Sequence, residues 1–176
     1  TAAGFALTAL WMPLFSQGWF GLCLLVIFAA LGCLAWSALQ LSQGQPLGGG
    51  RFWSWLPLSL HAGWLSLAAF LNLAQAALAW GWVAADAQLG SALALFAIAA
   101  AVLLELNRRM RGNLAYATAA LWGLAAVYVK QSGSFLPGAK TAAWVAAGIA
   151  ALLLLQTAWL RLRGPGAPAL PAHARP

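Results

Sequence analysis

The sequence predicts an all-α, polytopic bundle of transmembrane helices, and three observations lead to this fold class. Hydrophobic residues make up 64% of the 176 residues and charged residues only 6%, whereas an ordinary soluble domain has roughly 25% charged residues. The mean hydropathy is +0.84. The apolar residues form long runs, and the short alternating segments of a membrane barrel do not occur. We therefore expect one helix bundle over residues 1–160.

Six apolar segments follow one another along the chain. The first, Ala2–Phe15, is shorter than the about 20 residues that a span needs, and Pro13 is expected to bend its end. We expect this short segment to be followed by five full spans. They are Trp19–Leu41, Trp53–Trp82, Gln88–Leu106, Leu114–Val129 and Ala139–Leu160.

Two segments outside these runs have loop or tail composition. Ser42–Arg51 is polar and rich in glycine, which is typical of a loop. Arg161–Pro176 is rich in proline, glycine and alanine, so we expect a disordered cytoplasmic tail over residues 161–176. The chain begins at Thr1 without a methionine and enters an apolar segment at once. We expect a further N-terminal portion to precede it.

The basic residues indicate an orientation in the membrane. The net charge is +7, but the basic residues lie at span ends and in loops, so we expect no nucleic-acid partner. Alternating spans place every arginine on one side, and Lys130 and Lys140 with Asp86 on the other. Cytoplasmic loops carry the excess of basic residues. The sequence therefore predicts an integral membrane protein with its C-terminus in the cytoplasm.

The tryptophans fall into two groups according to their place in the spans. Indole is favoured at the headgroup level of a bilayer, and six tryptophans lie near predicted span ends. Three others lie inside spans, where an indole N–H needs a hydrogen-bond partner. The first group is Trp19, Trp53, Trp55, Trp80, Trp82 and Trp159, and the second is Trp11, Trp64 and Trp122.

The most informative feature is a polar stripe inside the third apolar run. His61, Trp64, Ala68, Asn72 and Gln75 follow one another at steps of three and four, so they share one face of a helix. Lipid cannot satisfy polar groups, which must face protein, a cavity or a ligand. Two interpretations remain open: hydrogen bonds that hold neighbouring helices together, and a groove for a flat aromatic ligand.

The other polar residues do not suggest catalytic chemistry. The chain has two acidic residues, which leaves little for general acid–base hydrolysis, and no catalytic triad, metal-ligand or phosphate-loop motif occurs. Glu105 is expected to pair with Arg108 and Arg109 at helical spacing. Cys23 and Cys33 are expected to be buried apolar side chains, without a disulfide or metal. We do not expect a hydrolytic enzyme.

Part of the stripe resembles a known membrane-protein family. Trp64 is followed four residues later by Ala68 and eight residues later by Asn72, with Leu71 before the asparagine and Pro57 upstream. This is similar to the pattern PYLxWxxFAxxLN on the fifth helix of the TspO family, the tryptophan-rich sensory proteins also called translocator proteins or peripheral-type benzodiazepine receptors. The interval from Pro57 to Trp64 is longer here than in the family.

Two further stretches carry the same resemblance. Leu7, Thr8, Trp11 and Phe15 fit the spacing of the family's third-helix pattern LNxxWSxxFF, with threonine in place of asparagine. Ala115–Lys130 (AYATAALWGLAAVYVK) is similar to larger bacterial members with extra helices. The family's WYxxLxKPxWxPP segment, which helps to form and cover the ligand pocket, has no equivalent here.

The resemblance implies a function and some of the residues that carry it. Members bind porphyrins, haem-like tetrapyrroles or sterols within the helix bundle, with roles in sensing, regulation or transport. Carried over by position, it points to Trp11, Trp64, Ala68 and Asn72 as ligand-binding residues. His61 and Gln75 are candidates through the stripe alone.

Three alternatives to ligand sensing stay open from the sequence. The first is an accessory structural subunit of a larger, pigment-containing membrane complex, because almost the whole chain is apolar. The second is light-driven porphyrin breakdown, and the third is transport of a small molecule. The expected partners are the lipid bilayer and a hydrophobic small molecule, with a homodimer or a membrane complex as further options.

Overall fold

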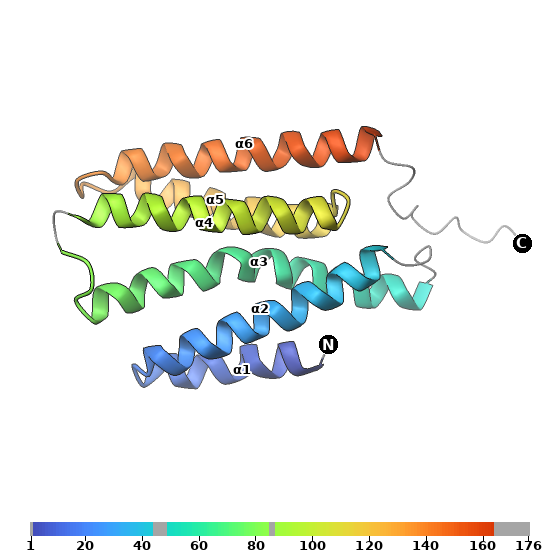
Figure 1. The fold of residues 1–176 in the computed structure, drawn as a ribbon, viewed down its shortest axis with the longest axis horizontal. Coiled ribbons are helices and arrows are strands. Elements are labelled where there is room, and N and C mark those ends of the chain that lie inside the picture. The colour runs from blue at the N-terminus through green and yellow to red at the C-terminus, as the bar shows by residue number, and fades with distance from the viewer. Residues whose placement is uncertain (1, 44–48, 85–86, 164–176) are drawn as a thin grey trace, which may run out of the picture.

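The computed structural model describes residues 2–43, 49–84 and 87–163, and within these ranges all regular structure is helical. This confirms the predicted all-α class. Helix bounds agree with the apolar runs to within a few residues at most ends. The helices are α1 (Ala2–Ser16), α2 (Phe20–Gln43), α3 (Gly49–Ala79), α4 (Gln88–Arg109), α5 (Leu114–Ser132) and α6 (Ala139–Arg163) (Figure 1).

Four of the helices, α2, α3, α4 and α6, are long and apolar enough to cross a membrane. Helix α1 has 15 residues, in keeping with the short segment predicted there. Helix α5 has 19 residues and ends in Lys130, Gln131 and Ser132, which shortens its apolar part. It is therefore not among the helices that are long and apolar enough to cross a membrane. The apolar helices indicate an integral membrane protein.

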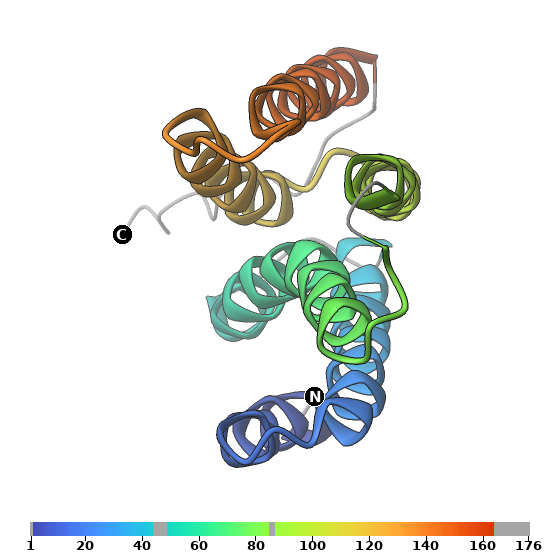
Figure 2. The ribbon, with the colours of Figure 1, turned by 90° about the vertical axis from the view of Figure 1, so that its left-hand side faces the viewer.

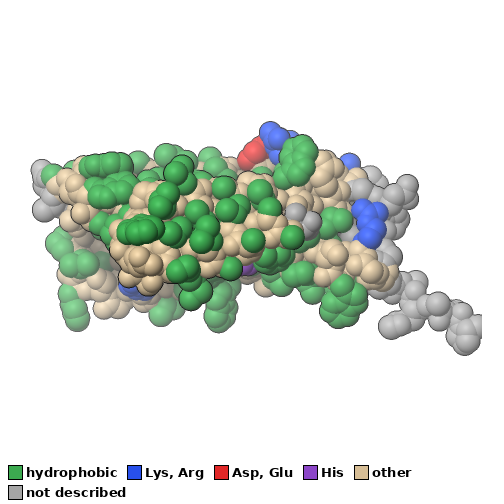
Figure 3. All heavy atoms as spheres, turned by 90° about the horizontal axis from the view of Figure 1, so that it is seen from below, with side chains coloured by type: hydrophobic (Ala, Val, Ile, Leu, Met, Phe, Trp, Pro, Cys, Tyr) green, Lys and Arg blue, Asp and Glu red, His purple; other side chains and the backbone are tan. Residues whose placement is uncertain are grey.

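The helices pack as a closed ring with two helices added to its side. Helix α3 packs against α5, α5 against α6, α6 against α4, and α4 against α3. Helix α2 packs on α3, and α1 packs on α2, so α1 lies at the edge of the molecule (Figure 2). Apolar side chains cover much of the surface visible in Figure 3. The core lies inside the ring and in the layer between α2 and α3.

The charged residues separate between the two ends of the bundle. The C-terminal ends of α1, α3 and α5 lie together at the left of Figure 1, and those of α2, α4 and α6 lie at the right. Lys130 and Lys140 therefore belong to the first end, and the arginines on α3, α4 and α6 to the second. Glu105 forms the expected ion pairs with Arg108 and Arg109, at 2.8 and 2.7 Å. Asp86 lies outside the described residues.

Two helices extend into segments that the sequence predicts as loop or tail. Helix α2 runs to Gln43 and α3 begins at Gly49, so both ends of the predicted loop Ser42–Arg51 are helical, while residues 44–48 lie outside the described ranges. Ser42 is buried, and its Oγ accepts hydrogen bonds from Trp55 Nε1 and from Nδ2 of Asn113, the residue before α5. These two bonds hold the C-terminal end of α2 in place. This ties Trp55, predicted at the membrane interface, to the protein.

The same holds at the end of the chain. Helix α6 continues through Arg163, whose guanidinium lies 4.9 Å from the centre of the Trp159 ring. A cation over an indole face is attractive, and this contact supports the last turn. The predicted disordered tail, residues 161–176, therefore starts in a helix, and its remainder, 164–176, lies outside the described residues.

Asn113 joins three helices at the arginine end of the bundle. Its Oδ1 accepts from the backbone N–H of Tyr116 at 3.1 Å and caps α5. Its Nδ2 donates to Ser42 Oγ at 3.0 Å on α2 and to Ser59 Oγ at 2.8 Å on α3. A capping side chain contributes about 1 kcal/mol, and a buried hydrogen bond contributes a similar amount.

Replacing Asn113 with alanine is therefore expected to lower the free energy of unfolding by about 2 kcal/mol. Denaturant titration followed by circular dichroism in detergent would measure the loss. Ser16→Ala is the matched control, because Ser16 is exposed and its hydroxyl bonds only within its own helix. An effect of Asn113→Ala no larger than that of Ser16→Ala would contradict the three-helix contact.

Candidate functional site

The candidate site lies on the face of α3 that carries the polar stripe. The opposite part of α3 packs closely on α5, because a Cβ atom at Gly63 would collide with the carbonyl oxygen of Tyr116. His61 instead reaches towards α1, where its ring lies 5.2 Å from the ring of Phe5. The stripe therefore faces α1 at its N-terminal residue, His61.

His61 forms the polar link between α3 and α1. Its Nε2 lies 3.1 Å from Thr8 Oγ1, and the side chain is half-buried. The Thr8 hydroxyl already donates to the carbonyl oxygen of Gly4 at 2.9 Å. The hydroxyl oxygen is then the acceptor from His61 Nε2–H, and in the neutral imidazole this leaves Nδ1 as an acceptor.

The backbones of α1 and α3 remain apart although their side chains meet. No Cα atom of α1 lies within 8 Å of a Cα atom of α3. Gly4 brings α1 against α2 instead, since the space for its Cβ is filled by the buried Leu34 side chain. The side chains of Thr8 and His61 bridge the space between α1 and α3. We call this boundary the α1–α3 seam.

Trp11 lies on α1, three residues after Thr8. Its ring stacks on Phe15 at 4.8 Å between centroids and packs against the core. Its Nε1 is buried and has no hydrogen-bond partner within the described residues. A buried donor without a partner costs about 1–3 kcal/mol, so the position favours a bound acceptor.

The remaining stripe residues differ in exposure. Trp64 is 44% exposed, and its six-membered ring lies beside Gly123 of α5, 3.7 Å from the place a Cβ would take there. Ala68 is half-buried against the core, and Gln75 is exposed. The two indoles thus have different neighbours, α5 for Trp64 and Phe15 for Trp11.

Asn72 is the most unusual residue of the stripe. It is 3% exposed, and its Oδ1 has no hydrogen-bond partner in the described part of the chain. Most buried polar atoms in proteins are hydrogen-bonded, so each exception needs an explanation. A ligand that donates a hydrogen bond to this oxygen would supply the missing partner.

Sequence reasoning did not single out Thr8 and Phe5 as contacts of the stripe. Thr8 entered only as a substitute in a motif, yet a hydroxyl in an apolar helix three residues before Trp11 was a usable signal. For metal binding, residues 2–43, 49–84 and 87–163 hold no group of three His, Cys, Asp or Glu side chains. A metal at the stripe would meet a single imidazole, that of His61.

The site therefore combines four chemical functions on two helices. An exposed indole, a buried amide oxygen and an imidazole nitrogen lie on α3, and a buried indole N–H lies on α1. Flat aromatic rings stack on indoles, and the polar atoms suit the edges of such a ring. The arrangement suits binding of a flat, mostly apolar molecule with polar edges.

Comparison with known proteins gives one match. A family model described as TSPO-like protein matches residues 2–159, which covers most of the chain. No curated protein and no solved structure matches the chain. The match includes α1 with Trp11 and the whole stripe on α3. The chain therefore belongs to the family of TSPO-like proteins.

Proposed function

We propose that this TSPO-like membrane protein binds a flat hydrophobic ligand, a porphyrin or a haem-like tetrapyrrole, at the α3 stripe and the α1–α3 seam. Binding there serves sensing, regulation or transport. The observation that carries the proposal is the buried Oδ1 of Asn72, which has no partner within the described residues. Family membership adds support, because the Trp64–Asn72 interval is the one that resembles the TspO pattern.

Each side chain has a distinct part in the proposed complex. The exposed Trp64 ring stacks on the ligand plane, and Ala68 leaves clearance. A hydrogen-bond donor at the edge of the ligand meets Asn72 Oδ1, and a ligand carboxylate accepts from Trp11 Nε1–H. His61 Nδ1 is oriented by the bond from Nε2 to Thr8 and meets a polar edge or a ring metal. Gln75 lies at the exposed end of the stripe.

We also infer the orientation of the protein. The arginine end of the bundle, with the C-terminus of α6, faces the cytoplasm of a bacterial inner membrane, because basic residues are retained on that side. His61 then lies nearer the cytoplasm than Gln75. Reactivity of single cysteines placed next to Arg111 and next to Lys130, with a membrane-impermeant thiol reagent on intact cells, would test this.

The double variant Trp64→Ala, Asn72→Ala tests the proposed site. One aromatic stack and one hydrogen bond together contribute about 2 kcal/mol, so we expect porphyrin affinity to fall about 30-fold. Quenching of the remaining tryptophan fluorescence by protoporphyrin would give the dissociation constant. Trp144→Ala is the control, because Trp144 is 70% exposed on α6, away from the stripe.

A decisive result requires that the variant stays folded. Its thermal unfolding in detergent should match that of the control. A folded double variant with the dissociation constant of the wild type would contradict the assignment of the site. Equal losses in the double variant and in Trp144→Ala would indicate binding to general apolar surface.

A further inference from the structure

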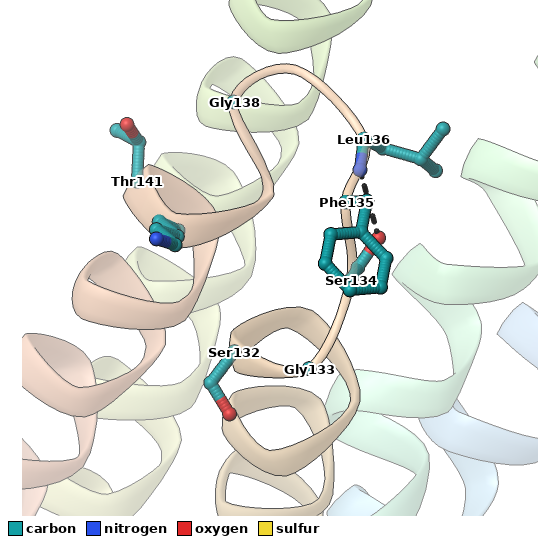
Figure 4. Close-up of a pocket in the computed structure, with 8 residues that line it drawn as sticks. Ser132, Gly133, Ser134, Phe135, Leu136, Gly138 and Thr141 are labelled. Atoms are coloured by element: carbon teal, nitrogen blue, oxygen red, sulfur yellow. Dashed lines mark hydrogen bonds between the residues drawn. The ribbon is translucent and has the colours of Figure 1, made fainter.

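A second possible site lies at the opposite end of the bundle from the arginines, where α5 connects to α6. A hollow of about 480 Å³ opens between the end of α5 and the start of α6. Its lining includes Ser132, Ser134, Lys140 and Thr141 (Figure 4). Neither the polar stripe nor the family resemblance involves these residues.

The lining offers hydrogen-bond donors and one positive charge. The backbone N–H of Leu136 donates to Ser134 Oγ at 3.2 Å, so that oxygen is already an acceptor and its O–H stays available as a donor. Lys140 and Thr141 are exposed, and neither side chain has a hydrogen bond or ion pair within the described ranges. The Lys140 ammonium and the Ser134 hydroxyl donor on the lining of one hollow suit a phosphate group, which has only acceptors.

The loop beside the hollow is apolar and projects outward. Phe135 is fully exposed, and Leu136 is 72% exposed. In Figure 4 the ring of Phe135 lies in front of Ser134, and Leu136 points away from the loop. The loop joins two helices of a membrane bundle, so these side chains lie at the level of the headgroups and upper acyl chains. A free anion gains no binding energy from these apolar side chains, whereas the acyl chains of a lipid do.

We propose that this hollow binds the phosphate group of an anionic phospholipid. Lys140 and Ser134 contact the phosphate, and the acyl chains lie against Phe135 and Leu136, while the Thr141 side chain points away from the Ser134 loop (Figure 4). This inference is independent of the ligand proposed for the α3 stripe. Lys130 lies at the same end of the bundle but does not line the hollow, so it contributes general surface charge alone.

Lys140→Gln and Lys130→Gln form a matched pair for the test, since each removes one positive charge from the same end. Each purified variant, as the full chain, would be equilibrated with equal amounts of phosphatidylglycerol and phosphatidylcholine. Bound lipid would then be counted by native mass spectrometry. We expect Lys140→Gln to reduce the preference for phosphatidylglycerol about fivefold, while Lys130→Gln keeps the preference of the wild type.

Two further arms separate the alternatives. Ser134→Ala removes the second donor, so it should weaken retention of phosphatidylglycerol in the same direction as Lys140→Gln. Excess inorganic phosphate in place of lipid should show no binding that depends on Lys140. Equal effects of both lysine variants, no effect of Lys140→Gln, or Lys140-dependent binding of inorganic phosphate without a lipid preference would each overturn the proposal.

Discussion

Replacing Gly63 with alanine is expected to lower the free energy of unfolding by about 3 kcal/mol, because α3 and α5 then no longer fit together. A Cβ at this position would collide with the carbonyl oxygen of Tyr116 and lie 3.0 Å from its carbonyl carbon and 3.2 Å from the Ala119 Cβ. The obstacle is backbone, so relief requires movement of the whole helix. Small residues allow such close approach of helices in membranes.

The effect would be measured as thermal unfolding in detergent with a thiol-reactive fluorescent dye. Cys33 is half-buried and would be replaced by alanine in every variant, whereas Cys23 is fully buried and becomes reactive only on unfolding. Gly32→Ala is the matched control, since no atom lies within 4 Å of its Cβ position in the middle of α2. Alanine is favoured over glycine in a helix by about 1 kcal/mol, so this control should be as stable as the wild type or more stable. Equal stability of Gly63→Ala would contradict the close contact between α3 and α5.

Truncation of Tyr116 to alanine is expected to cost about 3–5 kcal/mol. Tyr116 is the largest of the fully buried side chains in the described part of the protein. Its hydroxyl donates to Ser66 Oγ at 2.8 Å on α3 and lies 3.5 Å from the carbonyl oxygen of Leu103 on α4. One side chain therefore fills the space where α3, α4 and α5 meet, and alanine would leave a cavity there.

Tyr116→Phe separates the two contributions of this residue. It keeps the ring and removes the hydroxyl, so we expect a loss of about 1 kcal/mol. Both variants would be compared by the same thermal assay, with Tyr128→Ala as the control. Tyr128 is half-buried and meets Trp144 at 6.1 Å, so its truncation should cost less than that of Tyr116. If Tyr116→Phe cost as much as Tyr116→Ala, the hydrogen bonds rather than the packing would carry the stability.

The helices follow from the sequence because an apolar run of sufficient length has one stable form in a bilayer. The ends of helices follow less well. The end of α2 depends on Ser42, whose partner Asn113 lies 71 residues away in the chain. The local composition, with glycine and glutamine after Ser42, predicts a loop, because it does not reveal a hydrogen bond to a residue so far away in the chain.

The candidate site, too, was predictable from the sequence only in part. Periodicity places His61, Trp64 and Asn72 on one face of a helix, but it does not say which helix covers that face. Gly63 allows the other face of α3 to pack closely on α5, and Thr8 of α1 forms the contact with His61. These two contacts decide which helices cover each face of α3. Contacts between helices far apart in the sequence decide both points, and a single sequence does not encode them in a local pattern.

The ring of α3, α5, α6 and α4 has a consequence for the way the protein is made. Neighbours in the ring are not all consecutive in the chain, so the ring cannot close before α6 has entered the membrane. Ser59 lacks Asn113 until the start of α5 has been made, and Asn107 lacks Gln156 and Thr157, which it contacts at 2.7 and 3.0 Å, until α6 has been made. A nascent chain that has reached the end of α4 therefore carries polar side chains in the bilayer whose partners have not yet been translated.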